Sequence, residues 1–303
     1  MNNIEKQPVC HGPTNVAGIG GYLSSYQREK GWKSDFVTWS DNTMRQNHDF
    51  NLAIDQGHST IAKLWIVFSW FFLAIVKYKI FHFYYGRTLL PFGLDLPFLR
   101  LFRKKIVMTY VGSEVRLIYL EKKRNKYWHL LKISADHPKY DRQKKVMLWW
   151  HNLWCHKFIA TREQIEPVKE IIPDNKLFTK HWVINLGFNI ENCSDPETIN
   201  TSSTPVLVHA PSEPNIKGTK YVRIAIDELK NRGIEFEYKE LIGVPNSEAQ
   251  KIYSNADIIV DQFLVGGIGT LAFEGMGHGK PVVGYIMEEV LNKHMQDCPV
   301  FNA

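Results

Sequence analysis

The stretch VDQFLVGGIGTLAFEGMGHGKPVV, residues 260–283, decides the fold of the C-terminal part of the chain. It begins inside the strand-like run DIIVDQF and ends inside a second strand-like run, KPVVGYI. Between them, Gly266, Gly267 and Gly269 precede a helical pattern that Gly279 closes. A strand, a helix and a second strand in this order predict a parallel sheet with the helix packed on it.

The same glycine-rich loop predicts an anion site. Glycine lets backbone N–H groups approach an anion closely, and the N-terminus of the following helix favours negative charge. Glu274 lies more than one turn into this helix on a face of small and apolar residues. Its carboxylate can hold a ribose diol, as acidic residues do in other nucleotide folds. The alternative is a glutamate that faces solvent.

A second motif, VHAPSEPNIKGTKYV (residues 208–222), lies upstream. A strand ends, a loop of small residues turns, and Lys217-Gly218-Thr219 opens an amphipathic helix. A lysine beside free backbone amides suits a diphosphate, although an exposed lysine in a first helical turn is the alternative. Both motifs lie on crossovers of one sheet, so we expect them to converge on one ligand.

The N-terminal stretch HGPTNVAGIGGYL, residues 11–23, carries Gly18, Gly20 and Gly21 ahead of a helix. It nearly matches the dinucleotide fingerprint, but Leu23 replaces the third glycine and Trp39, not an acid, ends the second strand. The phosphate-loop pattern, the D-x-D pair and the zinc spacings are also missing from the sequence. We therefore expect a site without a metal or a bound cofactor.

Strand-like and helical patterns alternate along all 303 residues, which predicts an α/β protein of two doubly wound halves. We predict an N-terminal domain at residues 1–188, a polar linker at 189–205 and a C-terminal domain at 206–303. Ligands of such sheets bind beyond the carboxyl ends of the strands, here in a cleft between the halves. Scattered cysteines without metal spacing favour a reducing cytoplasm.

The net charge of +6 is uneven, because residues 100–180 hold 19 Lys and Arg against 8 Asp and Glu. A solvated face, an anionic membrane surface and nucleic acid are the possible reasons, and nucleic acid ranks last because no motif for it accompanies the charge. Trp149, Trp150 and Trp154 lie on a helix of this segment; the alternative to a membrane role buries Trp149 and Trp154 and exposes only Trp150. The apolar run at residues 64–76 is too short to span a membrane. We expect it to form a buried helix that leads into the next strand, with a helix lying on a membrane surface as the alternative.

The motifs together resemble the family 4 glycosyltransferases, which have the GT-B fold. Lys217-Gly218 with its helix, and GIGTLAFEGMGHGKPVV, are similar to the donor half of that family. The stretches HGPTNVAGIGGYLSSYQREKGWKSD, KIFHFYYG and VMTYVGSEVR are similar to its first half. The resemblance covers nearly the whole chain and implies two Rossmann-like domains that face a central cleft.

Site roles follow from this resemblance. Lys217, Gly269 and Thr270 would bind the donor diphosphate, and Glu274, the second acid of the family's E-x7-E motif, would hold the ribose. The cleft loop and acceptor side would include four glycines: Gly18, Gly20, Gly21 and Gly112.

The sequence departs from the family pattern at three places. Gly266 stands where the first acid of E-x7-E belongs, with Asp261 and Glu213 as candidates to replace it. Val111 stands where many members have histidine, with His82 and His209 as candidates. The chain ends soon after residue 296, so the crossover helix that usually closes this fold is missing from the sequence given.

The resemblance implies a retaining, metal-independent hexosyltransferase that uses a UDP or GDP sugar as donor. Its acceptor would be a glycan or a lipid-linked molecule, in surface polysaccharide or glycolipid synthesis. We expect a cytoplasmic protein, with peripheral binding to an anionic membrane through residues 100–180 and without nucleic acid. No residue stands out as the catalytic base. The alternatives are a nucleotide-sugar-binding protein without catalysis and a nucleotide-sugar epimerase of the same fold.

Overall fold

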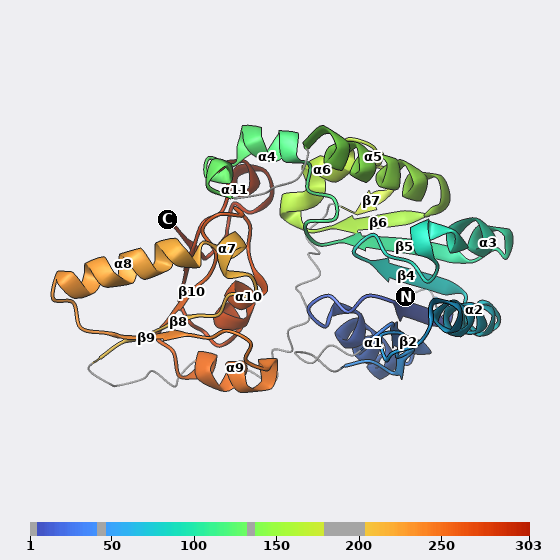
Figure 1. Ribbon diagram of the computed structural model, residues 1–303, viewed down its shortest axis with the longest axis horizontal. Coiled ribbons are helices and arrows are strands. Elements are labelled where there is room, and N and C mark those ends of the chain that lie inside the picture. The colour runs from blue at the N-terminus through green and yellow to red at the C-terminus, as the bar shows by residue number, and fades with distance from the viewer. Residues whose placement is uncertain (1–4, 41–46, 132–136, 179–203) are drawn as a thin grey trace. The chain divides into compact units, whose positions relative to one another are not determined.

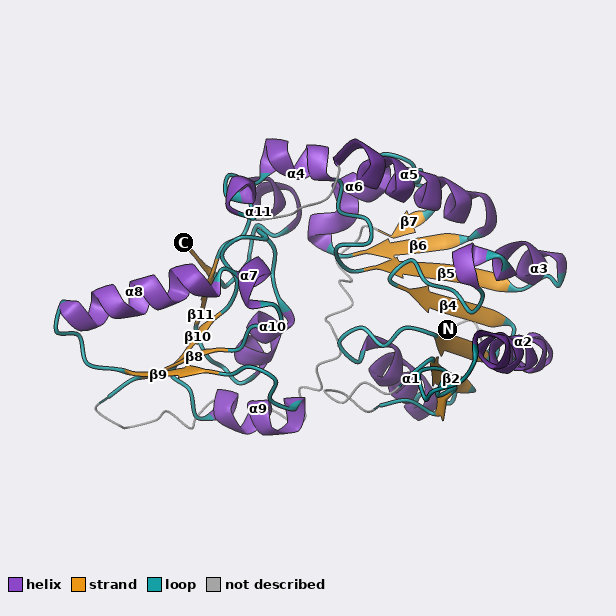
Figure 2. Ribbon diagram, viewed as in Figure 1, coloured by secondary structure: helices purple, strands orange, loops and turns teal. Residues whose placement is uncertain are grey.

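The structure, a computed structural model, describes residues 5–40, 47–131, 137–178 and 204–303 (Figure 1). Within these residues the chain divides into two compact units. The first unit combines Met1–Leu117 with His137–Gly187, and the second combines Ile118–Asp136 with Phe188–Ala303. Helices and strands alternate along both units, as Figure 2 shows, so the predicted α/β class is confirmed.

In the first unit the described strands form one parallel sheet in the order β3-β2-β1-β4-β5-β6-β7. The strands are β1 (Val9–Gly12), β2 (Ser34–Thr38), β3 (Phe50–Asn51), β4 (Ile80–Tyr84), β5 (Lys105–Tyr110), β6 (Lys157–Ala160) and β7 (Leu177–Phe178). The helices are α1 (Ile19–Glu29), α2 (Thr60–Lys77), α3 (Asp95–Leu101), α5 (His137–Trp154) and α6 (Ile165–Lys169), with 3-10 turns η1 (Pro91–Gly93) and η3 (Arg162–Gln164). The chain moves outward from β1 to β3 and then returns to place β4 on the other side of β1. In doubly wound sheets such a switch point is where ligands bind.

The main core of the first unit lies on one face of this sheet. Cys10, Phe81 and Ile106 on the strands are buried there among residues of α2, α3, α5 and α6. The opposite face carries His11 and His82, which are paired in register on β1 and β4. Because strand residues alternate between faces, each strand contributes to both layers.

Helix α2 corrects the expectation of a buried apolar helix. The Ser59 side chain caps its start by accepting a hydrogen bond from the Ala62 N–H, and the helix leads into β4 as predicted. However, only one side of it is buried, and Trp65 and Val76 on the other side are 70% and 84% exposed. Among the described residues, α2 is the one helix that is long and apolar enough to cross a membrane.

In the second unit the described strands form another parallel sheet, in the order β12-β11-β10-β8-β9. They are β8 (Val206–His209), β9 (Glu237–Glu240), β10 (Ile258–Val260), β11 (Val282–Gly284) and β12 (Phe301–Asn302). The helices are α4 (Ile118–Arg124), α7 (Pro214–Lys217), α8 (Thr219–Asn231), α9 (Asn246–Ser254), α10 (Thr270–Gly277) and α11 (Glu288–His294), with the 3-10 turn η2 (Trp128–Leu130). The switch point of this sheet lies between β8 and β10, the strands that precede the two predicted phosphate motifs.

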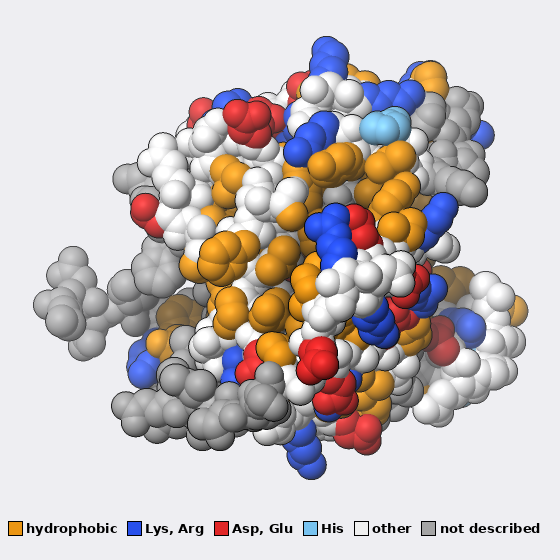
Figure 3. Space-filling model, turned by 90° about the vertical axis from the view of Figure 1, so that its left-hand side faces the viewer, with side chains coloured by type: hydrophobic (Ala, Val, Ile, Leu, Met, Phe, Trp, Pro, Cys, Tyr) orange, Lys and Arg blue, Asp and Glu red, His pale blue; other side chains and the backbone are white. Residues whose placement is uncertain are grey.

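Helix α8 packs on this sheet through Val222 and Ile226, which meet Val260 of β10. Figure 3 views the side of the molecule that carries α8, and hydrophobic side chains gather there in a broad patch. Exposed apolar residues of the second unit include Ile224, Ile234 and Phe301.

The basic segment at residues 100–180 does not form one solvated face. The basic residues of this segment cluster at 103–105, 122–124 and 144–145, and one from each cluster is nearly buried: Lys104, Arg124 and Lys144. The Lys104 ammonium donates to the Tyr78 carbonyl, and Lys144 donates to the Ser113 and Arg116 carbonyls. Arg124 forms an ion pair with buried Glu121. These cations therefore hold the fold together and are not available to a partner.

The same segment is divided between the units. Residues 118–131 pack in the second unit, where Asn125 donates to the Leu264 carbonyl at 2.8 Å. The predicted linker at 189–205 lies almost wholly outside the described residues. The domain limits near 188 and 206 remain a prediction.

Candidate functional site

The two predicted phosphate motifs of the second unit meet at the switch point of its sheet. Lys217 ends α7, directly after the loop that follows β8, and its ammonium donates to the Gln262 side-chain carbonyl. Gln262 follows β10, and its amide group donates to the Gly267 carbonyl at 2.5 Å. Gln262 therefore links Lys217 to the glycine-rich loop, a contact that the sequence pattern alone did not reveal.

Asp261 lies next to Gln262 and is buried against the same loop. Its carboxylate accepts the Gly269 N–H at 2.7 Å, and a Cβ on Gly269 would lie 2.5 Å from the nearer carboxylate oxygen. Burial raises the pKa of Asp261, against the opposing effects of the Lys217 ammonium and the Gly269 N–H.

The predicted contact of the Gly269 N–H with a phosphate is therefore corrected in this structure, because Asp261 accepts that N–H. Thr270 is the first residue of α10, where the N–H groups of the first turn have no partner within the helix.

Glu274 lies in the middle of α10 and is only 3% exposed. Its carboxylate accepts a hydrogen bond from the Asn246 side chain at the start of α9, at 2.9 Å. The alternative of a solvent-facing glutamate is wrong. A buried carboxylate is costly unless it is hydrogen-bonded, and the Asn246 side chain supplies one such bond.

Gly266 cannot carry the first acid of the E-x7-E motif without a change in the loop. Its φ angle is +69°, and a Cβ would lie 2.4 Å from Met287 Cγ and 3.1 Å from Tyr285 Cε1. The Gly266 carbonyl also accepts the Met287 N–H, which fixes the two segments together. The tight packing of this loop therefore explains why position 266 holds glycine and not the acid of the motif.

The candidates to replace missing family residues in this unit have other surroundings. His209 is buried at the end of β8, where Nδ1 donates to the Val260 carbonyl and Nε2 pairs with the Thr219 hydroxyl. Burial lowers the pKa of His209, so the ring is held as a neutral, fully bonded group. Glu213 is exposed at the start of α7, and Asp261 is bound to Gly269 as described above.

In the first unit, the glycine-rich loop after β1 is shaped by internal packing. Gly18 begins α1 in a left-handed conformation, and Asn47 donates to its carbonyl. Cβ atoms on Gly20 and Gly21 would lie 2.6 Å from the Phe36 ring and 2.0 Å from the Asn47 carbonyl. These three glycines are therefore needed for contact between α1 and its neighbours, and their role beside a ligand remains a proposal.

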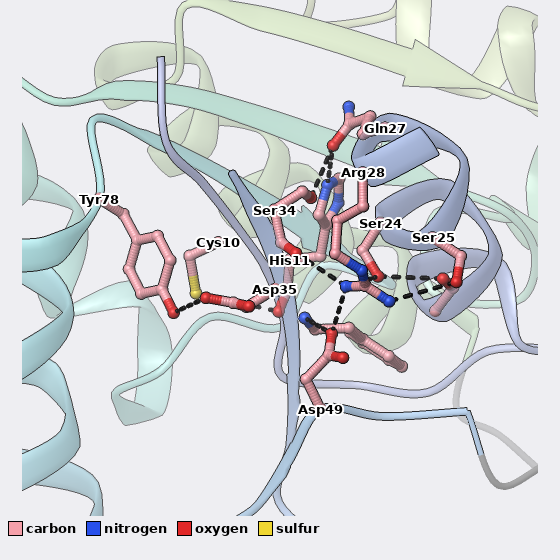
Figure 4. A network of polar contacts seen from close by, with 12 residues as sticks. Cys10, His11, Ser24, Ser25, Gln27, Arg28, Ser34, Asp35, Asp49 and Tyr78 are labelled. Atoms are coloured by element: carbon pink, nitrogen blue, oxygen red, sulfur yellow. Dashed lines mark hydrogen bonds and ion pairs between the residues drawn. The ribbon is translucent and has the colours of Figure 1, made fainter. Parts of the chain in front are cut away.

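A polar network joins α1 to β2 and to the residue that precedes β3 (Figure 4). The Arg28 guanidinium donates to Asp49, to the Ser34 carbonyl and to the hydroxyls of Ser24 and Ser25. Several partners hold one rigid guanidinium, so the helix that follows the glycine loop has a defined position.

His82 belongs to a buried chain of hydrogen bonds and is not a free group. It pairs with the Thr109 hydroxyl at 2.7 Å and with Tyr84, whose hydroxyl also pairs with His11. His11 in turn bonds the Gln27 side chain of α1. Burial lowers the pKa of His82 well below its usual range and that of His11 to about 4, so both rings are neutral near pH 7.

A cavity of about 1070 Å³ lies wholly within the first unit, between the segment after β4 and helix α5. Its wall combines apolar and aromatic side chains with exposed cations; the lining includes Trp39, Tyr85, Leu90, Phe92, Leu94, Val146, Met147, Trp149 and Trp150, and the cations Arg87, Lys139 and Arg142. The structure places Trp150 and Trp154 against the core and leaves Trp149 53% exposed. The alternative that buried Trp149 and exposed only Trp150 is therefore wrong.

Glu114 lines this cavity and is the carboxylate that the sequence analysis missed. One of its oxygens accepts the Val111 N–H at 2.6 Å, and the other is buried without a hydrogen-bond partner among the described residues. Burial raises the pKa of this carboxyl, which makes it a better proton acceptor. Gly112 lies beside it, since a Cβ there would be 3.6 Å from the unpartnered oxygen.

Three of these side chains could not be found from sequence spacing. Glu114 lies two residues beyond Gly112 in a quoted family-like stretch, but only the fold brings it beside Tyr85 and the end of β4. Arg87 and Arg142 are far apart in sequence, and only the fold places both of them in the wall of one cavity. Within the residues that the structure describes, no three His, Cys, Asp or Glu side chains gather as ligands for a metal ion.

Comparison with known proteins places the fold. No protein-family model matches the chain, and no curated protein matches it in sequence. Among solved structures, it is similar to the sucrose-phosphate synthase from Thermosynechococcus elongatus, with 12% identity, a TM-score of 0.53, and 92% of this chain and 81% of that one covered. It is also similar to the catalytic domain of starch synthase IV from Arabidopsis thaliana bound to ADP and acarbose, with 12% identity, a TM-score of 0.55, and 95% and 84% covered. The predicted α/β GT-B fold is confirmed.

Proposed function

We propose that this protein is a glycosyltransferase that takes its sugar from a nucleoside-diphosphate sugar bound by the second unit. The observation that carries the proposal is the link from Lys217 through Gln262 to the glycine-rich loop at the switch point of the sheet. It brings a cation, a glycine loop and the start of α10 to one place. The structure of starch synthase IV, which has this fold, was solved with ADP bound and supports a nucleoside diphosphate as the ligand.

Each group has a role in the transfer. The bond between the sugar carbon and the diphosphate oxygen breaks, and negative charge grows on the leaving diphosphate. The Lys217 ammonium and the Thr270 N–H at the positive end of α10 stabilise that charge, and Glu274 binds the ribose hydroxyls. Asp261 holds the loop in position through Gly269.

The cavity of the first unit is the proposed acceptor site. The unpartnered Glu114 oxygen can accept a hydrogen bond from an acceptor hydroxyl, with Tyr85 and Ser113 beside it. The hydroxyl oxygen forms the new bond to the sugar carbon and loses its proton. If transfer retains configuration, the leaving diphosphate can take that proton, and Glu114 then orients the hydroxyl.

Finer features are part of the same proposal. We infer membership of family 4, transfer of a hexose with retention, a UDP or GDP sugar as donor, and catalysis without a metal ion. We also infer a cytoplasmic enzyme that acts on a glycan or lipid-linked acceptor in surface polysaccharide or glycolipid synthesis. The resemblance of the donor motifs supports these points.

The test is calorimetric binding of UDP, GDP and ADP sugars to the wild type and to Lys217→Met, Glu274→Gln and the control Lys220→Ala. Lys220 is exposed on the first turn of α8, close in sequence to Lys217. One charge-assisted hydrogen bond contributes about 1.5–3 kcal/mol, so each site variant should weaken binding by roughly 10- to 150-fold. The control should bind like the wild type. Equal binding by all variants would show that the donor site lies elsewhere.

A nucleotide-sugar-binding protein without catalysis is the second candidate, favoured by the packing of Gly266 in place of the family's first acid. Chromatography of the nucleotide separates the candidates. A transferase releases nucleoside diphosphate when acceptor is added, an epimerase converts the sugar without acceptor, and a binding protein does neither.

A further inference from the structure

The helices that cover the core face of the first sheet expose an apolar surface, which we call the apolar layer. Its exposed side chains come from α2, from η1 and α3, and from α5: Ile61, Leu64, Trp65, Phe68, Phe72, Leu73, Val76, Phe92, Leu94, Phe98, Leu101, Phe102, Val146, Trp149 and Leu153. Figure 1 shows α5, α3 and α2 in succession alongside the sheet. Large apolar side chains exposed in such numbers on neighbouring helices indicate an interaction site.

Helix α2 is apolar on both sides. Phe71, Ala74 and Ile75 pack into the core, which attaches the C-terminal half of the helix to the sheet. The opposite side carries Trp65, Phe72 and other exposed apolar residues at helical spacing. A helix with one side in water normally has a polar outer face. Because its inner side is committed to the core, α2 can lie in a membrane surface but not cross it.

The exposed charge of the apolar layer is entirely positive. Residues 60–77 contain no acid, and the single acids of residues 91–105 and 137–154 are the buried Asp95 and Asp141. Exposed cations of these segments include Arg100, Arg103 and Lys105. Aromatic and aliphatic side chains flanked by cations match the head-group region of an anionic bilayer.

The proposed acceptor cavity opens on this layer. Phe92, Leu94, Val146 and Trp149 both line the cavity and belong to the exposed apolar surface, and Phe92 is 92% exposed. A surface that covers the layer therefore also meets the mouth of the cavity.

We propose that the first unit docks on an anionic lipid bilayer through the apolar layer, and that its cavity receives the head group of a lipid-borne acceptor. The assignment of a lipid-borne acceptor to the cavity rests on the proposed function, whereas the docking of the apolar layer on a bilayer does not. A second copy of the chain is a poorer occupant, because a symmetric contact would place the same cations opposite one another. An anionic bilayer complements them.

The first test is sedimentation with vesicles of phosphatidylcholine alone and of phosphatidylcholine mixed equally with phosphatidylglycerol. We expect binding to the mixed vesicles that falls with salt. The triple variant Arg100→Gln, Arg103→Gln, Lys105→Gln should lose on the order of 100-fold in partitioning, since each cation contributes about a fivefold factor. The control Lys122→Gln, Lys123→Gln removes basic residues of the second unit and should bind like the wild type.

The apolar contribution has its own variant. Trp65→Ser, Phe72→Ser, Leu73→Ser changes only exposed positions of α2 and should reduce partitioning by at least about tenfold. The matched control is Ile224→Ser, Ile234→Ser, Ile242→Ser, which changes exposed apolar residues of the second unit and should have no effect. Circular dichroism confirms that each variant is folded.

Brominated lipid tests the position of the cavity mouth. Bromine quenches tryptophans that enter the acyl region, so Trp149→Phe and Trp65→Phe should each remove part of the quenching. Trp32→Phe, beyond the end of α1 and outside the apolar layer, should leave it unchanged.

Equal partitioning of the α2 variant and wild type overturns the proposal. So does a concentration-dependent dimer, seen by analytical ultracentrifugation, that the α2 variant abolishes while vesicles stay unbound. Quenching that is unaffected by Trp149→Phe overturns the head-group role of the cavity. Donor binding is measured without lipid, so a failure here leaves the proposed donor site to its own test.

Discussion

The packing of Gly266 predicts that replacing it is costly, even with the acid that the related motif contains. Gly266 has a φ of +69°, which costs a residue with a Cβ about 1–2 kcal/mol. The Cβ would also lie 2.4 Å from Met287 Cγ, in a buried site, and such overpacking costs about 1–3 kcal/mol. Gly266→Ala should therefore lower the free energy of unfolding of this region by about 2–5 kcal/mol.

Gly243→Ala is the matched control. Gly243 has a φ of +70° in the same unit, but a Cβ at this position would have nothing within 4 Å. It should lose only the backbone contribution of about 1–2 kcal/mol. Hydrogen exchange of peptides covering α10 and β11 measures the free energy of opening for each variant. Equal effects of the two substitutions would refute the argument from overpacking.

Gly266→Glu extends the test to function. The added carboxylate would meet Met287 and the Tyr285 ring, so we expect a larger loss of stability and weaker donor binding. If Gly266→Glu had wild-type stability and bound donor more tightly, the position would be an open acid site, and the proposed packing role would be wrong.

Two further predictions concern stability. Burial lowers the pKa of His11 and of His151 to about 4, so the unfolded chain binds protons more readily and stability is lost as pH falls from about 6.5 toward 4. Between pH 6.5 and 5, His151→Gln should lose about 2 kcal/mol less free energy of unfolding than the wild type, as measured by urea unfolding. If the free energies of unfolding of the two proteins ran parallel over this pH range, the prediction would be contradicted. Asn125 donates to the Leu264 carbonyl and accepts the Tyr127 N–H, so Asn125→Ala should cost about 1–3 kcal/mol and speed hydrogen exchange in residues 118–131. The exposed Asn231→Ala is its control, and unchanged exchange in that segment would disprove the tether.

The sequence predicted the features that depend on local order. Alternating strands and helices, the glycine loop before α10 and the lysine before α8 are set by residues close together in the chain. Two parallel α/β sheets follow from that alternation, because a parallel strand pair needs a crossover and the crossovers are visible as helical patterns. The contact between the Lys217 loop and the glycine-rich loop was predictable for the same reason, since loops after neighbouring strands reach one edge of a sheet.

Local patterns could not decide whether a side chain is buried or exposed where the same residue type is chemically acceptable in either place. Lys104, Lys144 and Arg124 looked like members of basic clusters, and only long-range contacts with carbonyls or a buried acid show that they are structural. Both sides of α2 are apolar in sequence, so the pattern could not decide between a buried helix and one with an exposed apolar side.

The sequence by itself determined the α/β class and the strand-loop-helix form of the two motifs in the second unit, because hydrophobic period, glycine and capping act over a few residues. Only the tertiary structure decided that Asp261 takes the Gly269 N–H, that Glu114 lines a cavity with Arg87 and Arg142, and that residues 118–131 join the second unit. Those outcomes depend on which segments the fold brings within hydrogen-bonding distance. The free energy of such contacts cannot be calculated from local sequence, because it depends on partners that the local sequence does not specify.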